Sequence, residues 1–199
     1  MKRHIKQEKL NEFLQDFYNN SGKWYKDQIE NDWEFDEETQ LKIVQFSDYN
    51  KNEDPLIKFI KNPTKYVCLE AIKNNGYIIQ YINNPTEEML IEAVKQNGYI
   101  IKYIENPNEK ICLESVKRNG LTIEYIKNPS KEVQLEAIKN EGTAIKYINN
   151  PSKEIQLEAI KNDRRAIKYI DNPSYELQLK AVEYNGYTLE YIKNPSKEL

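Results

Sequence analysis

The sequence is poor in the residues that usually carry chemistry. It contains one histidine, His4, two cysteines, and six glycines that form no phosphate-binding loop. A histidine-based catalytic pair or a cluster of metal ligands therefore has too few members. No apolar run is as long as a membrane span, and the first residues lack the apolar core of a signal peptide. These absences predict a cytoplasmic protein that is not an enzyme, does not enter a membrane and uses no cofactor.

An excess of basic charge is also missing. Residues 1–62 hold ten basic and thirteen acidic residues, whereas residues 63–199 hold nineteen of each. The net charge of −3 therefore arises in the first part of the chain, and the remainder is neutral. Nucleic-acid-binding proteins normally carry a basic stripe. The charge distribution argues against nucleic acid as a partner and favours another protein.

What the sequence does contain is a repeat of 22 residues. Prolines recur at this interval at positions 63, 85, 107, 129, 151, 173 and 195, which gives six full repeats and a short stub, Pro195–Leu199. Self-similarity at a short, fixed period is typical of solenoids, in which each repeat buries its apolar face against its neighbours. We predict an all-α fold in which residues 63–199 form a right-handed α-solenoid of two-helix repeats.

The repeat 129–150 shows how the pattern predicts two helices. Apolar residues between Val133 and Ile138 follow helical spacing, and proline suits the first position of a helix. Either Asn150 or Ser152 can cap the next such helix, and the sequence leaves both open. Gly142 is expected to end the first helix in the left-handed conformation. A shorter and tighter helix follows, so we expect helices near residues 130–140 and 143–149.

Two neighbouring columns of the repeat do not vary. Every full repeat has tyrosine at the position of Tyr147 and isoleucine at the position of Ile148. Buried rings whose hydroxyl groups reach a partner explain the tyrosines, and we favour this core role over a binding stripe. Replacing Tyr125 or Tyr147 with alanine is then expected to cost roughly 3–5 kcal/mol.

The two cysteines, Cys68 and Cys112, occupy the same repeat position two repeats apart. Packed helices lie about 8–10 Å apart, so the pair is expected to be on the order of 20 Å apart. A disulfide needs Cα atoms within about 7 Å of each other. We therefore predict free, buried thiols. The same column holds glutamine in the later repeats, at Gln134, Gln156 and Gln178.

Residues 1–62 differ in composition from the repeats, because they hold all five phenylalanines and both tryptophans. Helices are predicted around Phe13 and Phe17 and over Trp24–Trp33. A third is expected after Asp36, which suits an N-cap. This third helix and the segment Leu56–Asn62 resemble a degenerate repeat. We predict that residues 1–62 form the helical N-terminal cap that solenoids usually need.

One candidate partner-binding stretch is Asp163-Arg164-Arg165, where Arg164 replaces the glycine of the other five repeats. Functional residues are expected where a regular array breaks its own rule, and drift in an exposed turn explains the change equally well. Because this position is expected to need a positive φ, Arg164→Gly is predicted to stabilise the fold by roughly 1–2 kcal/mol.

A second candidate stretch is the acidic, aromatic run over residues 24–38, which has seven acidic residues and one lysine. One interpretation is a recognition surface, even one that imitates nucleic acid. The other, which we favour, is the solvated face of a helical cap. The residues of this run that are candidates for partner binding are Trp24, Asp32, Trp33, Glu34, Asp36, Glu37 and Glu38.

The run 91–104, IEAVKQNGYIIKYI, resembles a bacterial and viral family of tandem repeats. Its units read roughly Leu-x-Ala-Val-x-x-Asn-Gly-x-x-Leu-x-Tyr, and its function is uncharacterised. More loosely, the run is similar to leucine-rich-repeat-variant solenoids, which pair a helix with a shorter one. The resemblance covers residues 63–199 and implies a helical solenoid without catalytic residues. Arg164 departs from the Asn-Gly signature of that family.

Taken with this resemblance, the sequence predicts a non-enzymatic scaffold for protein–protein interaction. A composition rich in Lys, Asn, Ile and Tyr suggests a low-GC bacterium or its phage, and many small phage proteins block host defences. The alternative function is therefore a phage-encoded, anti-CRISPR-like inhibitor that binds a protein complex, with the acidic cap as a nucleic-acid mimic. Because no polar cap follows the sixth repeat, end-to-end self-association through the C-terminal repeat is also expected.

Overall fold

The structure is a computed structural model that describes residues 36–47, 57, 60–184 and 186–199. Within these residues every regular element is a helix and none is a strand. Helices that follow one another in sequence pack against each other, which confirms the all-α repeat solenoid. Its right-handedness and the boundary between cap and array at residue 62 stay predictions. The chain divides into two compact parts, Met1–Gln96 and Asn97–Leu199.

The first part contains the α-helices α3 (Glu37–Ser47), α4 (Lys65–Asn74) and α5 (Glu87–Gln96), and the 3-10 helix η2 (Gly76–Tyr81). The predicted helices around Phe13 and over Trp24–Trp33 lie outside the described residues. Asp36 caps α3 as predicted, because its Oδ1 accepts a hydrogen bond of 2.8 Å from the backbone N–H of Thr39. Helix α3 packs on α4.

The described residues beside α3 support the degenerate repeat. Ile57 and Ile60 are buried, and the N–H of Ile60 donates to the carbonyl of Ile57 at 3.0 Å. Ile148 makes the equivalent 3.0 Å bond to Ile145 in a full repeat. The alignment of Leu56–Asn62 with the end of a full repeat therefore holds at these positions.

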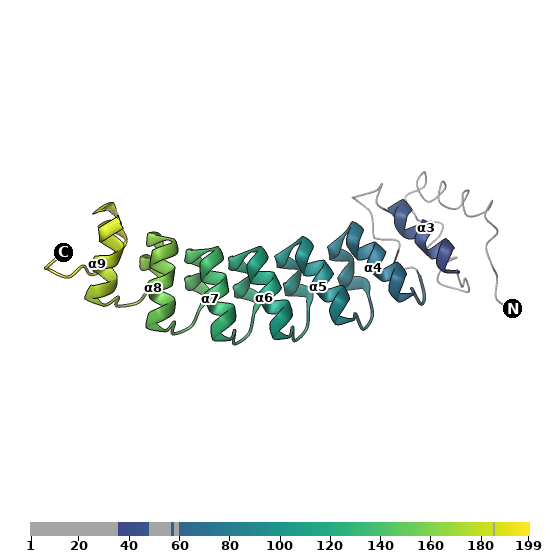
Figure 1. Cartoon of the computed structure of the whole chain (residues 1–199), viewed down its shortest axis with the longest axis horizontal. Coiled ribbons are helices and arrows are strands. Elements are labelled where there is room, and N and C mark those ends of the chain that lie inside the picture. Colours follow the sequence, from purple (N-terminus) through teal and green to yellow (C-terminus); the bar gives the residue numbers. More distant parts are fainter. Residues whose placement is uncertain (1–35, 48–56, 58–59, 185) are drawn as a thin grey trace. The chain divides into compact units, whose positions relative to one another are not determined.

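The second part alternates 3-10 helices and α-helices (Figure 1). In chain order they are η3 (Gly98–Tyr103), α6 (Glu109–Arg118), η4 (Gly120–Tyr125), α7 (Lys131–Asn140), η5 (Gly142–Tyr147), α8 (Lys153–Asn162), η6 (Arg164–Tyr169), α9 (Tyr175–Tyr184) and η7 (Gly186–Tyr191). Successive α-helices start 22 residues apart, as the prolines do. The second helix of each repeat, predicted to be short and tight, is a 3-10 helix of 6 residues.

Serine, rather than asparagine, caps the α-helices of the later repeats. The hydroxyl of Ser152 accepts a hydrogen bond from the N–H of Ile155 at 3.4 Å, and α8 begins at the next residue after the serine. Pro151 therefore precedes the cap, and its predicted place as the first helical residue was wrong. Asn150 instead takes the left-handed conformation, with φ 49°, which asparagine tolerates better than most residues.

The glycine column serves close packing and does not supply a positive φ. Among the described non-glycine residues, positive φ values occur at the asparagines before the prolines, such as Asn128 and Asn150. A Cβ added to Gly142 would lie 2.7 Å from the carbonyl oxygen of Ala159 and 2.8 Å from the N–H nitrogen of Asp163. The glycine therefore admits the backbone of the next repeat, and the predicted left-handed glycine was wrong.

Side-chain amides tie consecutive repeats together at the same place. Asn162 accepts a hydrogen bond from the N–H of Gly142 and donates one to the carbonyl of Lys139, both at 2.8 Å. Asn140 makes the same pair of bonds to the repeat before it. At the junction of the fifth and sixth repeats the sequence has Arg164 in place of the glycine and Tyr184 in place of the asparagine, so this clamp is missing there.

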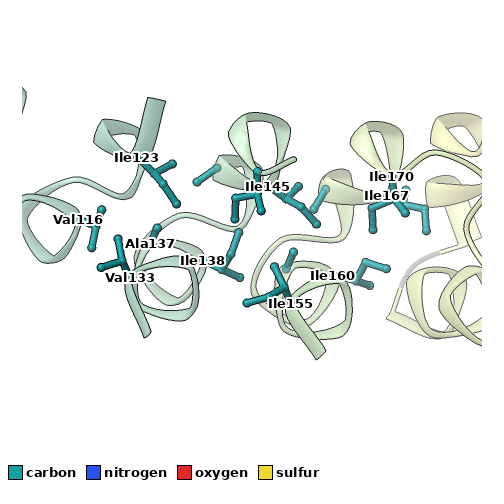
Figure 2. Packing of buried hydrophobic residues seen from close by; sticks show 14 of the residues in the cluster. Val116, Ile123, Val133, Ala137, Ile138, Ile145, Ile155, Ile160, Ile167 and Ile170 are labelled. Atoms are coloured by element: carbon teal, nitrogen blue, oxygen red, sulfur yellow. The ribbon is translucent and has the colours of Figure 1, made fainter. Parts of the chain in front are cut away.

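The core of the second part lies between the α-helices and the 3-10 helices. Figure 2 shows Ile145 and Ile167 from the 3-10 helices facing the layer that holds Ile138, Ile155 and Ile160 from the α-helices. Burying one such side chain contributes about 1.5–3 kcal/mol. Neither layer is wide enough to bury its apolar residues alone, which explains why the repeats must stack.

The stub is tied to the last repeat. The backbone N–H of Ser196 donates to Oε1 of Gln178 on α9 at 2.9 Å, and Leu199 packs against the apolar core. The end-to-end association predicted through the C-terminal repeat remains a prediction, because these contacts do not test it.

Candidate partner-binding surface

The tyrosine column lies at the surface of the second part, where Tyr103, Tyr125 and Tyr169 are exposed and Tyr147 and Tyr191 are partly buried against the core. The predicted core role was therefore wrong for the exposed tyrosines. Tyr125 is 40% exposed, whereas the adjacent Ile126 is 9% exposed. A 3-10 helix has three residues per turn, so residues i and i+3 share a face. Ile123 and Ile126 therefore occupy the inner face together, and the tyrosine between them must point elsewhere. We call the surface that carries Tyr103, Tyr125, Tyr147, Tyr169 and Tyr191 the tyrosine face.

Neighbouring side chains hold these rings in place. The ammonium groups of Lys102, Lys146 and Lys168 lie 4.8, 4.6 and 4.7 Å from the ring centroids of the tyrosines that follow them. Such cation–π contacts contribute about 0.5–1 kcal/mol at exposed sites. Between repeats, the rings of Tyr99 and Tyr125 meet edge to face at 6.2 Å. The rings are thus ordered before any partner binds, which lowers the entropy cost of binding.

A groove of about 720 Å³ lies beside Tyr125, between the turns that follow η3 and η4. Its lining includes Ile104, Cys112, Ile126 and Val133. Cys112 is a free, buried thiol, as predicted, and burial raises its pKa above the ordinary value. The groove therefore has an apolar floor beside an exposed aromatic ring.

The residue at the cysteine position changes along the repeats. In the later repeats Gln134 and Gln156 occupy the cysteine position, and each Nε2 donates to the carbonyl of its own repeat's proline at 2.9 Å. Cys112 is shorter, and its thiol donates to the carbonyl of Pro107 at 3.7 Å. A cysteine at this position therefore occupies less volume than the later glutamines do.

Within the stretch Asp163-Arg164-Arg165, the side chains of Asp163 and Arg165 bind each other. Asp163 caps η6, because its Oδ1 accepts a hydrogen bond from the N–H of Arg165 at 2.9 Å. The Arg165 guanidinium is 2.6 Å from Oδ2 of the same carboxylate. This hydrogen bond lowers the pKa of Asp163 below its ordinary value. Asp163 and Arg165 therefore have structural roles that the sequence reasoning missed.

Arg164 differs from its two neighbours. It is exposed, and it is not among the residues with a positive φ. Its guanidinium forms no ion pair with the residues that the structure describes. The predicted gain from Arg164→Gly rested on a strained φ, and this reason is wrong. Arg164 remains a candidate for partner binding because its side chain is exposed.

Four of the seven candidates in the acidic, aromatic run over residues 24–38 lie outside the described residues. Trp24, Asp32, Trp33 and Glu34 are not described. The other three, Asp36, Glu37 and Glu38, are exposed at the start of α3. Asp36 caps the helix, and Oε1 of Glu38 pairs with the ammonium of Lys42 at 2.8 Å. At least two of these acidic residues therefore contribute to the helix itself.

Within the described ranges, no cluster of His, Cys, Asp and Glu side chains is arranged to hold a metal ion. None of the helices described there has both the length and the apolar character needed to cross a bilayer. The surface features that do stand out in the described residues are the aromatic rings, the groove with its apolar floor, and the exposed Arg164.

These features define a tandem helical-repeat protein with an aromatic surface. A family model described as Domain of unknown function (DUF4116) matches residues 64–107 and 130–175, so the chain is similar to that family over two stretches of repeats. Between them lies the repeat that contains Cys112. The comparisons with curated proteins and with solved structures found no match.

Proposed function

We propose that this protein is a non-enzymatic scaffold that binds another protein through its tyrosine face. The observation that carries the proposal is the contrast between neighbouring columns, in which exposed or half-buried tyrosines each precede a more buried isoleucine along a regular array. Tyrosine is enriched at protein interfaces because its ring supplies apolar area and its hydroxyl remains wet. Stacked repeats extend this surface in steps, which suits an elongated partner segment.

The groove beside Tyr125 supports the same function. Hot spots in interfaces are usually anchor side chains that fill a pocket surrounded by polar groups. Here Cys112 and Ile126 line the floor, and Lys102, Glu105 and Glu109 lie around it. An apolar side chain of the partner is expected to enter this groove.

Affinity capture from the native host tests the proposal. The bait is the whole chain, either wild type or with both Tyr125→Ser and Tyr169→Ser on the tyrosine face. Tyr175→Ser is the matched control, because Tyr175 is 46% exposed but lies at the start of α9. We expect the double variant to lose the partner while its melting temperature falls by only a few degrees, and the control to keep the partner. A partner that the double variant retains contradicts the proposal.

The alternative function is a phage-encoded, anti-CRISPR-like inhibitor that binds through an acidic cap. Its supporting observation is the exposure of Glu37 and its neighbours at the start of α3. Charge-dominated binding weakens strongly with added salt, so a partner of the cap is expected to be released at high salt and by Glu37→Gln. A partner of the tyrosine face is expected to remain bound under both conditions.

A further inference from the structure

The tyrosine face carries one charged side chain per repeat, always immediately before the tyrosine. In chain order these residues are Lys102, Glu124, Lys146, Lys168 and Glu190. Lys146 and Lys168 are exposed on the adjoining helices η5 and η6. Neither forms an ion pair with the described residues, and each instead lies over its own tyrosine. Two neighbouring repeats thus carry lysines without an ion pair among the described residues. In the sequence, Glu124 precedes these lysines and Glu190 follows them.

The spacing of the repeats suits a particular backbone conformation in the partner. Stacked helices lie about 8–10 Å apart. A polyproline II helix has three residues per turn and rises about 3.1 Å per residue, so it presents the same side every ~9 Å. Every third residue of such a segment can therefore face successive repeats.

The chemistry of the face favours the same conformation. Segments in polyproline II conformation dock on rows of aromatic side chains, and ordered tyrosines form such a row here. Their backbone is fully solvated and needs no hydrogen-bonding partner. An added β-strand, by contrast, needs a free sheet edge, and the residues described contain no strand.

We propose that η4–η7 bind an extended, polyproline-type segment of a partner protein with charged residues at every third position. The order of those charges is basic, acidic, acidic, basic, opposite Glu124, Lys146, Lys168 and Glu190. The inference deepens the proposed function and rests on it, because it specifies the partner chemistry of the tyrosine face. Nucleic acid fits less well, since its continuous phosphate charge would also pass Glu124 and Glu190.

Two peptides of identical composition test the proposal in a fluorescence-anisotropy titration of the whole chain. Each consists of Pro-Pro-X triplets, with X in the order Lys, Glu, Glu, Lys in the first peptide and Glu, Lys, Lys, Glu in the second. Both orders read the same in either direction, so the orientation of binding does not matter. We expect the first peptide to bind about tenfold more tightly, which corresponds to four exposed charge contacts of a few tenths of a kcal/mol each.

Variants of the protein locate the contact. The double variant Lys146→Glu with Lys168→Glu should lose the preference for the first peptide, because either peptide would then place two lysines and two glutamates opposite four glutamates. Lys102→Glu is the matched control, because Lys102 also covers its tyrosine but lies beyond Glu124 on η3. This control should preserve the preference. Melting temperatures of all variants should fall by only a few degrees, since these side chains are exposed and each loses one cation–π contact.

Three results would overturn the proposal. They are equal affinity for the two peptides, absence of binding by both, and tighter binding of a single-stranded oligonucleotide than of the first peptide. The proposed function fails separately. If native capture still depends on Tyr125 and Tyr169 while the peptides do not bind, the scaffold stands and the polyproline-type partner is wrong.

Discussion

The α-helix surface and the tyrosine face of the second part use their charges differently. On the α-helix surface, Lys131 and Lys153 each reach a glutamate of the next helix, at 2.5 and 2.6 Å. On the tyrosine face, Lys146 and Lys168 cover their own rings. Exposed ion pairs contribute only about 0–1 kcal/mol to stability. The difference between the two surfaces therefore matters mainly for which lysines can bind a partner. Lys131 and Lys153 are thus paired within the protein, whereas Lys146 and Lys168 are without an ion pair among the described residues and can meet a partner's carboxylates.

The largest expected effect separates the two sides of a single 3-10 helix. Ile123 is fully buried and Tyr125 is exposed. We expect Ile123→Ala to cost about 2–5 kcal/mol, as large-to-small core changes do. Tyr125→Ala should cost below about 1 kcal/mol, the usual range for changes at the surface. Urea unfolding of both variants measures the difference, and similar losses would return the tyrosine column to the core.

The next effect tests the close approach between repeats. Gly142→Ala places a Cβ against the backbone of the following repeat, and we expect a loss of about 1–3 kcal/mol from overpacking. Arg164→Ala is the matched control in the same column, and it should be nearly neutral because the arginine already has a Cβ. Thermal melts compare them. If Gly142→Ala is also neutral, close approach does not explain the glycine column.

The amide clamp should have a smaller effect. Asn162→Ala removes the bonds to Gly142 and Lys139, and we expect it to cost about 1–2 kcal/mol. The reciprocal change, Arg164→Gly together with Tyr184→Asn, is expected to build the missing clamp and to raise the melting temperature. Arg164→Gly alone should give no gain, because glycine only adds freedom to the unfolded chain. A gain from the single change would disprove this account of the junction.

Filling the groove should stabilise the protein slightly. Cys112→Gln copies the later repeats, where the glutamine amide donates to a proline carbonyl, and one such bond contributes about 0.5–1.5 kcal/mol. The same change should weaken capture of the partner if an apolar side chain enters the groove. Capture that is unaffected by a stabilising Cys112→Gln would exclude the groove from the interface.

The smallest effect concerns pH. The folded pKa of Asp163 is lowered by Arg165, so its contribution to stability is present above the unfolded pKa of about 3.9 and is lost as the pH falls through the lower, folded value. Because Arg165 is largely exposed, this contribution should stay below about 1 kcal/mol. Asp163→Asn keeps a capping oxygen and should flatten this part of the stability profile below about pH 4. An unchanged profile would contradict the assignment.

The α-helices could be placed from the sequence because their apolar spacing and capping residues are local signals. The tyrosines were misplaced because their helix has a period of three, and the isoleucines at i and i+3 already fill its inner face. That signal was present in every repeat. The roles of Gly142 and Asn162 could not be predicted in the same way, since both depend on how the next repeat is positioned.

The candidate residues for partner binding also divide into those with a local sequence signal and those that depend on the three-dimensional arrangement. Arg164 was identified because it breaks a column, and its exposure supports that choice. The pairing of Asp163 with Arg165 depends on the turn between α8 and η6, and the groove depends on how the turns after η3 and η4 lie beside each other. Neither appears as a motif in the sequence.

Hydrogen exchange measured with and without the captured partner tests the central claim most directly. If the tyrosine face binds the partner, amides of η4, η5 and η6 and of the turns that follow them should exchange more slowly in the complex, while those of α7, α8 and α9 should not change. Slower exchange confined to the α-helices, with the 3-10 helices unaffected, would show that the partner binds the other surface.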